Sequence, residues 1–101
     1  MAWDCYSQTA AEGAYTGPGA LLGDVVAAAS AINARWGVAE LGSRLAIGDA
    51  GTRRAEWLAS VGAYALDHEA AFVIYFNSGG QADLPLTDEP SIAAWRSLVT
   101  G

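Results

Sequence analysis

One carboxylate lies near the end of a short apolar run, Trp-Gly-Val-Ala-Glu-Leu-Gly-Ser, at positions 36–43. Runs of this kind are typical of buried parallel strands. A carboxylate in such a strand is costly to bury unless it is paired or used in chemistry. Glu40 is therefore either a structural anchor, paired with Arg44, Arg53 or Arg54, or a reactive group. A reactive group would lie at the C-terminal end of its strand, where parallel α/β folds carry out their chemistry.

Polar and aromatic side chains lie at the ends of two further strand-like segments. Adjacent strands are about 4.8 Å apart, so Tyr6 and Glu40 come within hydrogen-bonding reach if both point the same way. Carboxylates among aromatic rings suit neutral polyols, because the rings stack on sugar faces and the carboxylates accept from hydroxyls. An ordinary aromatic core is the alternative for Tyr6, Tyr75 and Phe76. The candidate groups are Asp4, Tyr6, Glu40, Tyr75, Phe76 and Asn77, with Tyr15, Asp83, Asp88 and Glu89 in the loops.

Apolar periodicity and turn residues predict the elements that must position these groups. Strands are expected over 2–6, 37–41 and 71–76, and helices over 19–35, 51–67 and from Pro90 to the last residues. Asp49 is a candidate cap for the second helix, and Asp88 or Glu89 for the third. This β-α-β-α-β-α order predicts an α/β fold with three parallel strands in one domain over residues 1–101.

The predicted helices also divide into inner and outer faces. In the first helix, apolar residues recur at helical spacing as far as Ile32, and the small residues opposite suggest cover on more than one side. In the second, Leu58, Val61 and Ala65 form the expected inner stripe, and Arg53, Arg54 and Glu56 the expected solvated face. The loops that leave the strands are longer than those that enter them, as in parallel α/β proteins with a site at the C-terminal edge.

Composition narrows the possible partners. The chain has a formal charge of −6 and contains no lysine, which argues against phosphate backbones and anionic membranes as partners. With Cys5 as the one cysteine and His68 as the one histidine, we expect no zinc site, no Cys–His nucleophile and no cofactor. Cys5 is expected to be a small buried residue. No signal peptide or membrane span is predicted, and the sequence leaves the localisation open.

Four segments together resemble the last three βα units of retaining glycoside hydrolase barrels, and most closely the mannanase-like family 26. The segments are Trp-Asp-Cys-Tyr-Ser, Trp-Gly-Val-Ala-Glu-Leu-Gly-Ser, Arg-Arg-Ala-Glu-Trp-Leu and Phe-Val-Ile-Tyr-Phe-Asn-Ser. The resemblance implies that Glu40 is the nucleophile ending the seventh barrel strand and that Tyr6 supports it. It also implies that Tyr75 or Phe76 forms an aromatic platform. Asp4, Tyr75, Phe76 and Asn77 are then expected to contact the sugar.

This sequence departs from the family at the second catalytic carboxyl group. Retaining glycosidases need two carboxyl groups about 5–5.5 Å apart, and the family places the acid/base on a fourth barrel strand that has no counterpart here. Asp4 is a possible substitute by proximity alone. The implied activity is hydrolysis of β-glycosidic bonds only when the missing strands are supplied. The other hypothesis is a non-catalytic α/β module that binds a carbohydrate or a partner through its long loops.

Three strands with helices on one face would leave the other face and both edges uncovered. We consider three outcomes. The chain is a segment of a longer barrel; or it assembles with itself or with a complementing half-barrel; or it folds alone with its first helix moved across the uncovered face.

Overall fold

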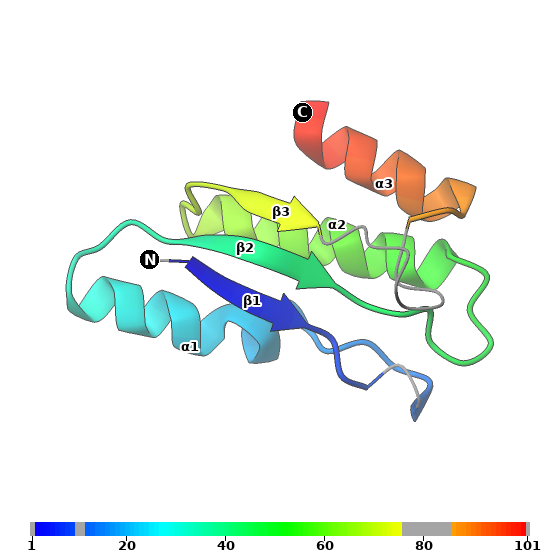
Figure 1. Ribbon diagram of the computed structural model, residues 1–101, viewed down its shortest axis with the longest axis horizontal. Helices are drawn as coiled ribbons and strands as arrows, with labels where there is room; N and C mark the ends of the chain where they lie inside the picture. The colour runs from blue at the N-terminus through cyan, green and yellow to red at the C-terminus, as the bar shows by residue number, and fades with distance from the viewer. Residues whose placement is uncertain (1, 10–11, 76–85, 101) are drawn as a thin grey trace.

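The computed structural model describes residues 2–9, 12–75 and 86–100, and it confirms the predicted α/β order (Figure 1). The three strands are parallel and lie side by side in the order β1-β2-β3. In chain order the elements are β1 (Ala2–Tyr6), α1 (Pro18–Ala31), β2 (Gly37–Gly42), α2 (Thr52–Asp67), β3 (Val73–Tyr75) and α3 (Glu89–Thr100).

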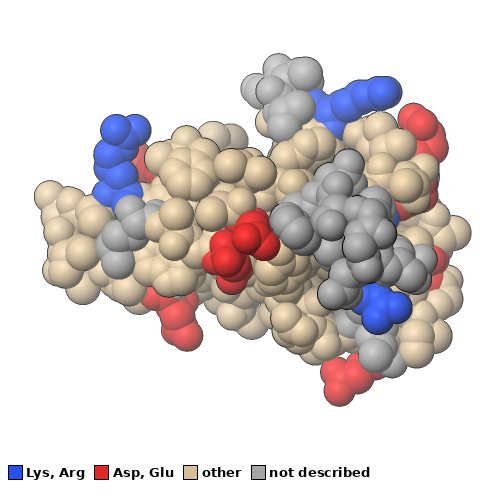
Figure 2. Space-filling model, viewed as in Figure 1, with Lys and Arg blue, Asp and Glu red and all other residues tan. Residues whose placement is uncertain are grey.

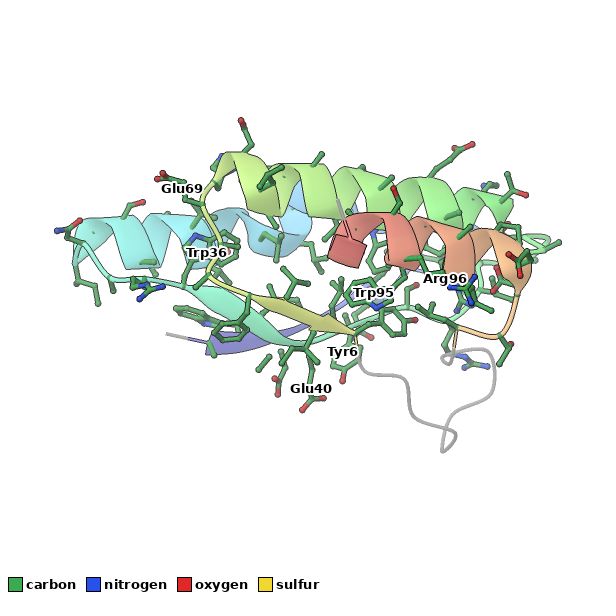
Figure 3. All side chains as sticks on the ribbon, turned by 90° about the horizontal axis from the view of Figure 1, so that it is seen from above. Tyr6, Trp36, Glu40, Glu69, Trp95 and Arg96 are labelled. Atoms are coloured by element: carbon green, nitrogen blue, oxygen red, sulfur yellow. The ribbon has the colours of Figure 1, made fainter. Side chains whose placement is uncertain are left out.

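All three helices lie on the same side of the sheet (Figure 3). The idea that the first helix crosses to the uncovered side is therefore wrong for this structure. Among the residues that the structure describes, no helix lies on the other side, which we call the open face. By strand alternation it carries Asp4, Tyr6, Glu40, Phe72 and Ile74. Sequential strand order with every helix on one side is the winding found in βα barrels, whereas doubly wound sheets carry helices on both faces.

The core lies between the sheet and the helices α1 and α2. Leu58, Val61 and Ala65 are buried, as the predicted inner stripe requires, and Trp57 is buried beside them. In α1 only one face is buried, and Ile32, just beyond the end of the helix, is 65% exposed. The expectation that α1 is covered on more than one side, with Ile32 in its stripe, is therefore wrong. Cys5 is buried as expected, and burial raises the pKa of its thiol.

Strand β2 contains one extra residue relative to both neighbours. Trp3 pairs with Val38 and Asp4 with Glu40, and the register with β3 shifts over the same residues. An extra residue of this kind is a β-bulge, which reverses the facing of every later side chain in the strand. Val38 and Leu41 are consequently both buried on the helix side, and Glu40 points to the open face.

A buried arginine connects β2, α2 and α3. The side chain of Arg54 is fully buried, whereas the sequence predicted a solvated position. Its Nη1 donates to the Ser43 carbonyl at 3.0 Å, its Nε to Ser91 Oγ at 3.0 Å, and its Nη2 to Asp88 Oδ1 at 2.6 Å. This ion pair fixes the start of α3 against the end of β2. The cost of burying the charged guanidinium is offset by three acceptors, the Ser43 carbonyl, Ser91 Oγ and the Asp88 carboxylate.

Candidate functional site

The hydroxyl of Tyr6 donates a hydrogen bond to Oε1 of Glu40 across the two neighbouring strands. Figure 3 shows both side chains pointing away from the helices, from the C-terminal halves of β1 and β2. Both are half-buried. The bulge produces this meeting, because a regular strand with Val38 facing the helices would turn Glu40 toward the helices as well. The pairing of Tyr6 with Glu40 that the sequence suggested is thus present.

The environment of Tyr6 strongly favours its protonated form. Burial, the hydrogen bond to Glu40 and the negative charges of Glu40 and Asp4 together raise the pKa of Tyr6 to about 12. A phenol held protonated in this way is a permanent donor to the carboxylate at ordinary pH. It fixes one oxygen of Glu40, and the described residues give the other oxygen, Oε2, no hydrogen bond.

None of the expected arginine partners pairs with Glu40. Arg54 pairs with Asp88, and Nη2 of Arg53 donates to the Gly13 carbonyl at 2.6 Å. Arg44 is exposed, and within the described part of the chain Glu40 takes part in no ion pair. Figure 2, which looks onto the open face, shows acidic side chains near its middle and arginine side chains toward its rim. The prediction that Glu40 is anchored by an arginine is therefore wrong for this structure, and Glu40 is hydrogen-bonded to Tyr6.

Asp4 lies directly beside Glu40. The two residues are partners in the β1–β2 ladder, so both carboxylates face the open side about one strand spacing apart. Asp4 is exposed to water. A general acid of a glycosidase is kept protonated by an apolar pocket, and the exposed position of Asp4 offers none. Asp4 can therefore contact a polar ligand, but it lacks the surroundings of an acid/base.

Tyr75 does not join the Tyr6–Glu40 pair. It is paired in the ladder with Leu41, which faces the helices, and its ring packs against Trp95 of α3 at a centroid distance of 5.8 Å. Its hydroxyl donates to the Ser43 carbonyl at 3.2 Å. Tyr75 is thus a core residue, as the alternative interpretation had it. Phe76, Asn77 and Asp83, which the sequence also pointed to, lie outside the described residues.

Two of the loop residues considered for polyol binding, Tyr15 and Asp88, make contacts within the fold instead. Tyr15 donates to Asp49 Oδ2, accepts from the Ala46 amide at 2.9 Å and stacks on Trp57. Burial and the hydrogen bond to Asp49 raise the pKa of Tyr15 to about 12, against the opposing hydrogen bond from Ala46. Asp88 accepts from the Ser91 amide at 2.9 Å at the start of α3. Glu89 is exposed there.

The carboxylate of Asp49 caps α2, as predicted, although the residue in the N-cap position is Gly51 and not Asp49. Its two oxygens accept from the backbone amides of Gly51, Arg53 and Arg54 at 2.9, 3.1 and 2.8 Å. Burial would raise the pKa of Asp49, but these bonds and the one from Tyr15 outweigh burial and lower it. These bonds tie the loop between β2 and α2 to the first turn of α2.

Sequence reasoning missed two features that position the site, and each left a signal. Val38 and Leu41 are apolar and three residues apart, a spacing that puts both on one face of a strand only if a bulge intervenes. Arg54 lies four residues before Leu58 and seven before Val61, which is the spacing of the inner stripe and not of a solvated face.

Nothing in the described residues adds a metal or a membrane segment to this site. Within ranges 2–9, 12–75 and 86–100, the side chains form no group of three or more potential metal ligands. Over the same ranges, no helix combines the length and apolar character needed to cross a bilayer. No protein-family model matches the chain, and no curated protein matches its sequence.

Proposed function

We propose that this chain is a segment of a retaining glycoside hydrolase barrel in which Glu40 is the nucleophile. The observation that carries the proposal is the hydrogen bond from Tyr6 to Glu40 on the open face of a singly wound parallel sheet. A closed βα barrel has its helices outside and the equivalent face inside, with catalytic groups at the C-terminal strand ends. The bulge at β2 supports the proposal, because bulges are common beside active sites, where they redirect a side chain.

The chemistry assigns one role to each partner. Oε2 of Glu40 attacks the anomeric carbon, a C–O bond to the carboxylate forms, and the glycosidic C–O bond breaks. The departing oxygen takes its proton from an acid on a strand supplied by the rest of the barrel. Water then cleaves the glycosyl-enzyme ester. Tyr6 holds the carboxylate in place through Oε1 and keeps its own proton throughout.

Asp4 has a binding role in this scheme. Its exposed carboxylate beside Glu40 can accept hydrogen bonds from sugar hydroxyls next to the reacting carbon. Sugars offer several hydroxyl donors, so a second acceptor on the open face favours a polyol over a charged acid. The proposed substrate is a neutral β-glycan, and the resemblance to the family 26 enzymes makes β-mannan the first to test.

Complementation tests the proposal. The chain is mixed with a polypeptide carrying the first five βα units of a family 26 mannanase, and release of reducing sugar from β-mannan is measured. Hydrolysis should require both polypeptides, since only one carries Glu40 and only the other carries the acid/base. Glu40→Gln should lower kcat by at least about 1,000-fold. Asp24→Asn, an exposed change on α1, is the matched control and should leave the rate unchanged.

Absence of hydrolysis by a complex that does form would contradict the catalytic role. Equal rates for the parent chain and Glu40→Gln would contradict it too. In either case the second hypothesis gains, a non-catalytic module whose open face binds a glycan through Tyr6, Glu40 and Asp4. The observation that favours this second function is that Asp4, the one carboxylate beside Glu40 in the ladder, is exposed.

A further inference from the structure

The contact between Tyr6 and Glu40 runs diagonally across the ends of β1 and β2. In the ladder Tyr6 is paired with Gly42, and Glu40 with Asp4, so the phenol reaches back over two residues of β2 to meet the carboxylate. Just beyond Tyr6, the backbone amide of Ser7 donates to the Gly42 carbonyl at 3.0 Å. A diagonal contact of this kind depends on how the two strand ends lie relative to each other.

The first peptide after β2 is fixed by two buried side chains. The Ser43 carbonyl accepts from Nη1 of Arg54 at 3.0 Å and from the Tyr75 hydroxyl at 3.2 Å. The side chain of Arg54 is fully buried, and its other two nitrogens donate to Ser91 and Asp88 at the start of α3. A planar guanidinium whose three nitrogens bond to three different residues is held in one orientation. The end of β2 is therefore fixed by a group that cannot easily turn away.

The end of β1 is connected to the same helix. Oγ of Ser7 accepts from the Thr16 amide at 2.9 Å, and the Thr16 carbonyl accepts from Nε1 of Trp57 at 2.7 Å. Trp57 lies three residues after Arg54 in α2, so the two side chains are neighbours on one face of the helix. The N-terminal half of α2 thus supports both of the strand ends that carry Tyr6 and Glu40.

We propose that Arg54 is a positioning residue for the Tyr6–Glu40 pair. It acts through the Ser43 carbonyl, because it holds the end of β2 in the position at which the Tyr6 hydroxyl meets Oε1 of Glu40. Its own side chain is buried on the helix side of the sheet and does not face the substrate. The inference rests on the proposed function only for its effect on kcat, since the contact between Tyr6 and Glu40 is measurable without a substrate.

The titration of Tyr6, followed by the Cζ chemical shift of ¹³C-labelled tyrosine, tests the proposal. In Arg54→Met we expect the pKa of Tyr6 to fall from about 12 by at least about one pH unit, because its hydrogen bond to Glu40 is weakened. Loss of the arginine charge alone would act in the opposite direction, since a phenolate is less favourable without a nearby cation. Tyr15 shows that direct effect: the charge of Arg54 lowers the pKa of Tyr15, which should therefore rise in the variant.

Two further variants separate positioning from stability. Val61→Ala removes packing from the buried face of the same helix but no hydrogen bond to a strand end, and it should leave the pKa of Tyr6 at about 12. Arg54→Lys keeps the buried charge but offers one nitrogen where the arginine bonds through three. It should fold even if Arg54→Met does not, and it should lower the pKa of Tyr6 by a smaller amount.

Kinetics of the complex with the half-barrel polypeptide give the second readout. Both Arg54 variants should lower kcat by about 10- to 100-fold and change KM by less than about twofold, because a displaced nucleophile slows the chemical step. Val61→Ala should leave kcat unchanged. Circular dichroism of each variant shows that the fold is present.

Three results would overturn the proposal. The first is a Tyr6 pKa that stays at about 12 or rises in folded Arg54→Met or, if that variant does not fold, in Arg54→Lys. The second is an equal fall in Val61→Ala, which would attribute the change to lost stability. The third is a loss of kcat/KM that lies in KM alone. A complex of the parent chain that forms but hydrolyses nothing contradicts the proposed function instead, and the Tyr6 titration then decides the role of Arg54.

Discussion

The hydrogen bond between Tyr6 and Glu40 couples the titration of a phenol to the charge of a carboxylate. The phenol is deprotonated only at a pKa of about 12, since burial and the neighbouring negative charges oppose a second anion. This coupling gives the site a signature that is measurable without any substrate. It also distinguishes a hydrogen-bonded pair from two polar side chains that only share a face of the sheet, because the pKa of Tyr6 changes on replacement of Glu40 only if the two side chains are in contact.

Replacing the carboxylate should release the phenol. In Glu40→Gln we expect the pKa of Tyr6 to fall from about 12 toward the ordinary value of about 10, because the hydrogen bond to an anion and its charge are both removed. The Cζ chemical shift of ¹³C-labelled tyrosine, followed against pH, measures this. Tyr15, which donates to Asp49 on a different loop, should stay at about 12 and is the internal control. An unchanged Tyr6 titration would mean that the contact is absent in solution.

The same shift predicts how stability depends on pH. The folded-state pKa values of Tyr6 and Tyr15 are raised, so their contribution is complete below the unfolded value of about 10. It is lost as the pH rises through about 12. The free energy of unfolding should therefore decrease over this alkaline range, and in Glu40→Gln the decrease that belongs to Tyr6 should shrink. Urea titrations at several alkaline pH values measure both.

Replacing Arg54 or its neighbour Arg53 compares a buried arginine with an exposed one and so measures how much the buried contacts of Arg54 stabilise the fold. Arg54→Met should destabilise the fold by about 3 kcal/mol or more, because Asp88 would lose its buried counter-charge. Arg53→Met should cost less than about 1 kcal/mol, since Arg53 is exposed. Urea unfolding of both variants gives the comparison. Similar losses for the two would show that Arg54 is not the structural centre described above.

At the level of helices and strands, the crossing of α2 and α3 depends on a glycine. A Cβ added at Gly62 would lie 2.1 Å from Cδ2 of Leu98 and within 3.1 Å of two further atoms of that side chain. At Gly23, in α1, the nearest atom would be the Tyr64 hydroxyl at 4.0 Å. Both positions are helical, so alanine has the same intrinsic advantage at each, about 1 kcal/mol. Alanine at Gly23 therefore reports the gain in helix propensity alone, and alanine at Gly62 reports that gain together with the cost of contact with Leu98.

Gly23→Ala should stabilise the protein by up to about 1 kcal/mol, and Gly62→Ala should destabilise it by about 1 kcal/mol or more through overpacking. Urea unfolding measures both changes against the parent chain. If Gly62→Ala were stabilising to the same degree as Gly23→Ala, then α3 would not be packed against α2 as closely as the structure has it.

The sequence predicted the strands and helices because their signals are local. The apolar run at 71–75, the stripe of Leu58 and Val61 and the cap at Asp49 all depend on neighbours in the chain. The bulge in β2 and the burial of Arg54 depend on partners more than thirty residues away, such as Trp3 and Asp88. The periodicity of the sequence does not identify which distant residues will be their partners. This is why the pairing of Tyr6 with Glu40 could be anticipated while its cause, the bulge, was not.

At the scale of the whole molecule, three helices cover one side of the sheet, and among the described residues nothing covers its other face or its two edges with a further helix or strand. The proposed barrel requires more strands than these, and Glu40 as the proposed nucleophile requires an acid at a defined distance. In that proposal one addition meets both requirements, namely strands that continue the sheet and carry the second carboxyl group. Closure of the barrel and the onset of catalysis are then expected to occur together.

Trapping of a glycosyl-enzyme tests the central claim that Glu40 is a nucleophile. The chain, complexed with the half-barrel polypeptide, is incubated with a 2-deoxy-2-fluoro-β-mannoside that carries an activated leaving group. Peptide mass spectrometry then locates the label. We predict one fluoromannosyl group on the peptide that contains Glu40, and none when Glu40→Gln is used. A label on Asp4 or elsewhere, or an equal label on the Glu40→Gln variant, would contradict the account.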